Sequence, residues 1–131
     1  MLARSFKSAA DLGLREVEYN ALITVLGMLE RAELDHRFKM TMWLCEAGSD
    51  DCQTTGCIAG WAYMVSGRRA FKGVEGGGGP MGVRNNKNLW ALLHPDFKVA
   101  AYATAKSGAV ALANYLTTGE PDWDAAMLID S

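Results

Sequence analysis

Three cysteines and two histidines are the side chains of this sequence best suited to chemistry. Thiolate and imidazole groups are preferred ligands of zinc, so these side chains could form a tetrahedral site. They are Cys45, Cys52, Cys57, His36 and His94. Six residues separate the first two cysteines and four separate the last two, whereas zinc knuckles usually have the C-x2-C spacing. The spacing disfavours a zinc site, and a small zinc-binding protein centred on Cys52 and Cys57 stays an alternative.

Cys57 is also a candidate nucleophile. If Thr54 caps the helix that follows, Cys57 lies in its first turn, where the aligned backbone dipoles lower the pKa of a thiol. Catalysis would also need a base, and neither His36 nor His94 belongs to a pattern that ties it to Cys57. A cysteine-dependent enzyme is therefore the other form of the alternative.

A structural role is favoured for the same segment, Cys52-Gln-Thr-Thr-Gly-Cys-Ile-Ala-Gly-Trp61. In this interpretation Cys52 and Cys57 flank a tight turn, and Thr54 caps the helix. Gly60 then allows the long C-terminal helix to dock closely, and Trp61 fills the space beside it. A buried cysteine in such a corner needs no reactivity. We therefore expect no catalytic residue, no metal and no cofactor.

The glycines between residues 72 and 88 match a second chemical pattern. Gly77-Gly-Gly-Pro-Met-Gly82 satisfies the dinucleotide fingerprint G-x-G-x-x-G. That fingerprint needs a strand before the loop and a helix N-terminus after it, but a helix end precedes these glycines and Pro80 interrupts them. We predict a flexible Gly-rich loop over 72–88 that binds no nucleotide. Asp50-Asp51 is interpreted as a solvated turn.

Length and charge narrow the class of protein. The chain has 131 residues, enough for one domain with its own core, and its 13 basic and 15 acidic residues leave a net charge of −2. Without a basic stripe, direct binding to nucleic acid is not expected. No window reaches the roughly 18 apolar residues of a membrane span, and the start of the chain lacks a secretory pattern. The odd number of cysteines favours the reducing cytoplasm.

Hydrophobic periodicity predicts four or so helices within one domain, residues 1–131. The predicted helices are Leu14–Glu33 with Asp11 as its cap, Gly56–Ser66, Asn88–Leu93, and Lys98–Thr118 with Gly119 as its C-cap. Residues 1–12 are expected to be flexible. The tail is expected to fold back through Trp123, Met127 and Leu128, and a short strand pair near Phe38 and Val83 is left open. The predicted fold class is mainly α, a compact helical fold.

The order of several signals resembles a family of small, largely uncharacterised bacterial and phage proteins. The signals are Phe38-Lys-Met-x-x-Trp43, then Cys52-x-Thr-x-Gly-Cys-Ile-Ala-Gly-Trp61-Ala, then Leu89-Trp-x-Leu-Leu93, and finally Tyr115-Leu-x-Thr-Gly-Glu-x-Asp-Trp123. The family is typified by F-x-M-x-x-W followed by C-G-T-x-x-C-I-A-G-W-A. This sequence departs from it at Gln53 and in the Gly76–Gly79 run.

The resemblance implies no established activity, cofactor or catalytic residue. It suggests a mobile-element setting, in which small single-domain proteins often bind and block host or phage machinery, as anti-CRISPR and other anti-defence inhibitors do. This implication comes from the genomic setting and the small size of such proteins rather than from any particular residue.

The function predicted from these observations is a non-enzymatic, protein-binding module of phage or prophage type. Its expected partner is a host or phage protein complex in the cytoplasm, with no membrane and no direct nucleic acid involved, and a homodimer is left open. Binding residues concentrate on loops carried by a rigid scaffold. The candidate contact residues are the cations around the Gly-rich loop, Arg68, Arg69, Lys72, Arg84 and Lys87.

Overall fold

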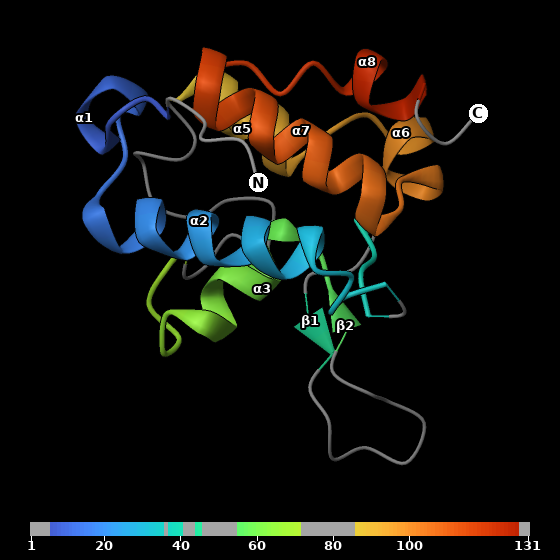
Figure 1. Cartoon of the computed structure of the whole chain (residues 1–131), viewed down its shortest axis with the longest axis horizontal. Coiled ribbons are helices and arrows are strands. Elements are labelled where there is room, and N and C mark those ends of the chain that lie inside the picture. The colour runs from blue at the N-terminus through green and yellow to red at the C-terminus, as the bar shows by residue number, and fades with distance from the viewer. Residues whose placement is uncertain (1–5, 36, 41–43, 46–54, 72–85, 129–131) are drawn as a thin grey trace.

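The computed structural model describes residues 6–35, 37–40, 44–45, 55–71 and 86–128 (Figure 1). The helices within these ranges are α1 (Ala9–Leu12), α2 (Glu16–Glu30), α3 (Ile58–Val65), α5 (Lys87–Leu93), α6 (Phe97–Tyr102), α7 (Ala105–Thr118) and α8 (Trp123–Met127). The mainly α fold class predicted from the sequence is confirmed. Among the described residues, every helix is too short or too polar to cross a membrane.

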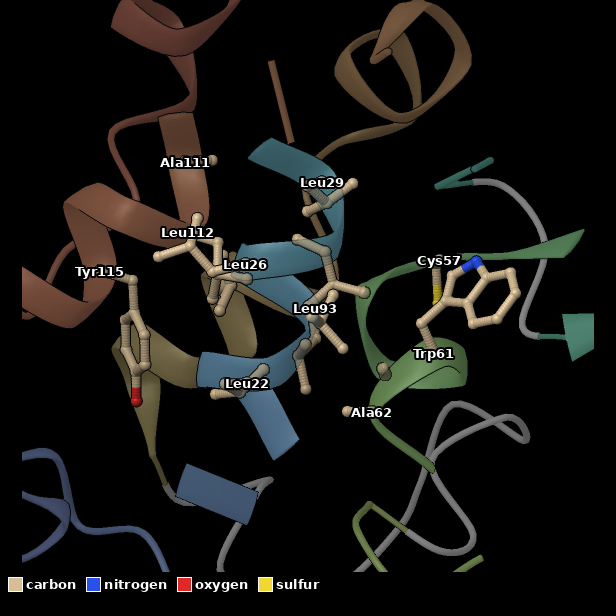
Figure 2. Close-up of a cluster of buried hydrophobic side chains, with 14 of the residues drawn as sticks. Leu22, Leu26, Leu29, Cys57, Trp61, Ala62, Leu93, Ala111, Leu112 and Tyr115 are labelled. Atoms are coloured by element: carbon tan, nitrogen blue, oxygen red, sulfur yellow. The ribbon is translucent and has the colours of Figure 1, made fainter. Parts of the chain in front are cut away.

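Helix α2 lies at the centre of the fold, between α7 on one side and α3 on the other (Figures 1 and 2). Its apolar residues recur at three- and four-residue spacing, and Leu22, Leu26 and Leu29 are buried. Burying each such leucine contributes about 1.5–3 kcal/mol.

The prediction that Gly60 lets α3 dock on the C-terminal helix is wrong in its partner, because α3 packs against α2.

The first predicted helix, Leu14–Glu33, is shorter than expected and has a separate helix before it. Ser8 caps α1, and its hydroxyl accepts a hydrogen bond from the backbone N–H of Asp11, whose carboxylate in turn accepts one from the N–H of Ser8. Asp11 therefore belongs to the first turn of α1 and does not cap α2. Gly13 ends α1 at φ 69°, a left-handed conformation that glycine adopts readily. Part of the 1–12 segment expected to be flexible is thus helical.

The last predicted helix, Lys98–Thr118, is broken into α6 and α7. The backbone is extended at Ala103, and the Thr104 hydroxyl accepts a hydrogen bond from the N–H of Ser107 to start α7. A threonine hydroxyl can cap a helix as readily as it can lie within one, so the unbroken apolar spacing concealed the break. Gly119 closes α7 in the left-handed conformation (φ 90°), as predicted.

Two short strands extend the fold near the end of α2. Leu44–Cys45 (β1) pairs antiparallel with Thr55–Gly56 (β2), and Phe38 forms an isolated parallel bridge with Gly56. This pair is not the one near Phe38 and Val83 that the sequence left open, and Phe38 bridges to Gly56. Val83, its suggested neighbour, lies outside the described residues.

The tail folds back on the body of the molecule, as predicted, through α8. The indole N–H of Trp123 donates a hydrogen bond of 3.1 Å to the carbonyl of Ala91 in α5, and the Trp123 side chain is buried. Met127 packs partly buried against the core. Leu128 was expected to join them, but it is the C-cap of α8 and is 73% exposed.

Candidate functional site

Cys57 forms the N-cap of α3. Its Sγ accepts a hydrogen bond of 3.5 Å from the backbone N–H of Gly60, and the residue is only 7% exposed. The helix begins at Ile58, so the predicted start at Gly56 with a threonine cap is wrong. Gly56 belongs to β2, and Thr54 and Cys52 lie outside the described residues.

The environment of Cys57 raises the pKa of its thiol. Burial is the largest cause, because the thiolate would lose its hydration, and the backbone N–H groups of Gly60 and Ala59 oppose it only partly. The lowered pKa expected from a position at the start of a helix is therefore not found. A thiol that stays protonated near neutral pH is a poor nucleophile.

Trp61 and Phe38 connect this cap to the rest of the core. The indole N–H of Trp61 donates a 2.9 Å hydrogen bond to the carbonyl of Arg37, which also accepts one of 3.0 Å from the N–H of Gly56. The Phe38 ring lies against α7 at Gly108, where a Cβ atom would stand 2.7 Å from the ring. Residues that carry the family resemblance thus form a packed corner, and Gly60 and Trp61 are both buried in α3.

The remaining metal or catalytic candidates do not assemble in the part of the chain that the structure describes. Within it, no group of three or more His, Cys, Asp or Glu residues could hold a metal ion. His36 lies outside it. His94 ends α5 with its ring 4.1 Å from the ring of Trp90, and burial lowers its pKa. Its Nε2 atom is buried and has no hydrogen-bond partner among the described residues.

Arg68 and Arg69 lie on an exposed turn directly after α3. Arg68 takes a left-handed conformation (φ 66°), and its guanidinium lies 5.9 Å from the centre of the Tyr63 ring. The backbone N–H of Arg69 donates to the hydroxyl of Ser66, and its side chain donates to the carbonyl of the same serine. Lys87 is exposed at the start of α5. The other two predicted contact residues, Lys72 and Arg84, lie outside the described ranges.

Phe71 and Asn86, which flank residues 72–85 in the sequence, both bond to the corner where α1 meets α2. Before it, the N–H of Phe71 donates to the carboxylate of Glu18, which is 5% exposed and paired with Arg15. After it, the side-chain amide of Asn86 donates a 2.7 Å hydrogen bond to the carbonyl of Leu12. The Arg15-x-x-Glu18 spacing is the signal in the sequence that could have suggested this pairing.

A polar cleft of about 290 Å³ opens beside this corner, between the start of α1, the start of α5 and the end of α7. Its polar lining residues are Lys7, Asp11, Asn86, Asn88, Tyr115 and Thr118. Tyr115 is only 1% exposed, and among the described residues its hydroxyl has no hydrogen-bond partner. Burial raises the pKa of this hydroxyl, so it stays protonated. No pattern in the sequence points to the cleft, because three distant segments form it.

Comparisons with protein-family models, with curated proteins and with solved structures find no match to this chain.

Proposed function

We propose that this protein is a non-enzymatic protein-binding module of phage or prophage type, which inhibits a host defence complex such as a CRISPR effector in the cytoplasm. The observation that carries the proposal is the exposed turn of Arg68 and Arg69. Its hydrogen bonds to Ser66 fix the backbone of Arg69, so less conformational entropy is lost when a partner binds. Arginine is also enriched at protein–protein interfaces.

The state of Cys57 supports this proposal over the enzymatic alternative. The Cys57 thiol caps a helix, belongs to a buried residue and has a raised pKa, so it has neither the access nor the ionisation that a nucleophile needs. Its contacts account for the cysteine as part of the packed corner.

The test compares two charge-reversal variants that change the net charge equally. One carries Arg68→Glu and Arg69→Glu; the control carries Lys98→Glu and Lys106→Glu, at exposed positions of α6 and α7. Each tagged protein is used to capture partners from a lysate of CRISPR-carrying bacteria, and is also expressed in those cells during infection by a targeted phage.

We expect the wild-type protein and the lysine variant to capture the same defence complex and to restore plaque formation. The arginine variant should lose both effects while keeping the wild-type circular dichroism spectrum. If the folded wild-type protein neither captures a defence complex nor restores plaques, the proposal is wrong. If both variants lose capture and plaque formation equally, the contact with the partner does not lie at the arginine turn.

A further inference from the structure

The walls of the polar cleft are held by hydrogen bonds between segments distant in the sequence. The N–H of Lys7 donates to the carbonyl of Leu116 in α7 at 2.7 Å, and the carbonyl of Lys7 accepts from the hydroxyl of Tyr19 in α2 at the same distance. On the opposite wall, Asn86 is bonded to Leu12. The cleft is thus pre-formed, as small-molecule sites usually are.

Tyr115 supplies a polar group in this cleft that the protein does not use for itself. Its ring leaves α7 and its hydroxyl points away from Leu112, toward the side of the molecule where α1 lies (Figure 2). That hydroxyl is buried and unpartnered within the described part of the chain. Because a buried hydroxyl without a partner is costly and phenylalanine would fill the same space without that cost, the hydroxyl indicates a ligand-directed role.

Two opposite charges line the same cleft without pairing to each other. Neither Lys7 nor Asp11 takes part in an ion pair within the described ranges, whereas Arg15–Glu18 and Arg31–Glu33 do. The stem of Lys7 lies beside Gly119 at the end of α7. One carboxylate oxygen of Asp11 accepts a 3.4 Å hydrogen bond from the N–H of Ser8. Its other oxygen accepts none from the described residues.

We propose that this cleft binds a small zwitterion with the chemistry of a free amino acid. Lys7 faces the carboxylate of the ligand, Asp11 faces its ammonium group, and the Tyr115 hydroxyl bonds to the polar group that enters furthest. The cleft volume of about 290 Å³ equals that of about ten liquid waters, which is too small for a dinucleotide or a folded peptide. The site is separate from the Arg68–Arg69 turn and does not depend on its partner.

The test is isothermal titration calorimetry of the whole chain with each of the twenty standard amino acids. We expect at least one to bind with a saturable one-to-one isotherm. Its N-acetyl and carboxamide derivatives each lack one charge, and both should bind at least about tenfold more weakly. If no amino acid binds at concentrations on the order of 10 mM, or if either derivative binds as tightly as its parent, the zwitterion site is disproved.

Three variants assign the contacts. Lys7→Gln, Asp11→Asn and Tyr115→Phe should each weaken binding by about tenfold or more, while Lys106→Gln, on the exposed face of α7, should leave it unchanged. The substitutions change the size of each side chain only slightly, and circular dichroism checks that each variant is folded. Binding that is equal in all four variants would show that the ligand lies elsewhere and would overturn the assignment.

Discussion

Cys57 shows how the surroundings of one residue decide its role. A helix cap is usually serine, threonine, aspartate or asparagine, because their oxygens accept backbone hydrogen bonds well. Here the cap is buried among apolar side chains such as Trp61 (Figure 2). Sulfur is a weak acceptor that tolerates such burial, so cysteine satisfies the N–H of Gly60 without placing a strongly polar group in the core.

Removing the cap should destabilise the protein. Cys57→Ala leaves the Gly60 N–H without its acceptor and opens a small space, so we expect a loss of about 1–2 kcal/mol in the free energy of unfolding. Cys57→Ser keeps an acceptor and should cost less than the alanine variant. Urea denaturation followed by circular dichroism measures both. If serine and alanine cost the same, the capping bond contributes nothing.

The hydroxyls of Tyr19 and Tyr115 differ in their hydrogen bonding, so their removal can be compared. The Tyr19 hydroxyl donates a 2.7 Å hydrogen bond to the carbonyl of Lys7, whereas the Tyr115 hydroxyl is buried without a partner among the described residues. Tyr19→Phe should therefore destabilise the ligand-free protein by about 1 kcal/mol, and Tyr115→Phe should be neutral or stabilise it by up to about 1 kcal/mol. Thermal unfolding measures both. A loss in Tyr115→Phe as large as that in Tyr19→Phe would mean that its hydroxyl is already bonded.

At the scale of elements, the contact between α7 and the segment before β1 depends on the absence of one side chain. Gly108 lies inside α7, where glycine is unfavourable for the helix. Glycine at this position lets the Phe38 ring approach the helix closely, since a Cβ atom there would stand 2.7 Å from the ring. Close packing against Phe38 thus outweighs helix propensity at this position.

Alanine substitutions at two glycines separate packing from propensity. Gly108→Ala should destabilise the protein by about 1–2 kcal/mol, because overpacking against Phe38 exceeds the gain in helix propensity. Gly27→Ala in α2 meets only the flexible guanidinium of Arg31 and should stabilise by up to about 1 kcal/mol. Chemical denaturation measures both. If Gly108→Ala is stabilising, the ring moves away without cost and the close contact is unimportant.

At the scale of the whole molecule, α2 joins the parts of the fold. It packs against α3 and α7, and its first turn holds the chain after α3 through Glu18 and Phe71. Asn86, the N-cap of α5, bonds to Leu12 at the end of α1, which precedes α2 in the chain. The arginine turn and the polar cleft are therefore carried by the same central scaffold.

Global stability should depend on pH through His94. Burial lowers its pKa from 6.5, so the unfolded chain binds the proton more readily than the folded protein does. Stability should therefore fall as pH decreases below about 6.5, until His94 is protonated in the folded state as well. In His94→Gln, the decrease in the free energy of unfolding between pH 7 and 5, measured with urea, should be smaller. Equal slopes in the two proteins would assign the effect to other groups.

The sequence by itself determined the features that depend on neighbouring residues. The helix that ends before Pro95, the C-cap at Gly119 and the mainly α class follow from periodicity and local stop signals, because these act within a few residues. Even there, the break before Thr104 was missed, since one residue type suits both a cap and a helix interior.

Only the tertiary structure decided which side chains are buried and which segments meet. Cys57, for which the sequence favoured a structural role and kept a nucleophilic one as the alternative, is a buried cap with a raised pKa, and Glu18 lies in a buried pair with Arg15. The cleft at Tyr115 exists because α1, α5 and α7 come together. Burial and long-range contact depend on how helices pack, and helical spacing specifies only that a face is apolar, not which helix will cover it.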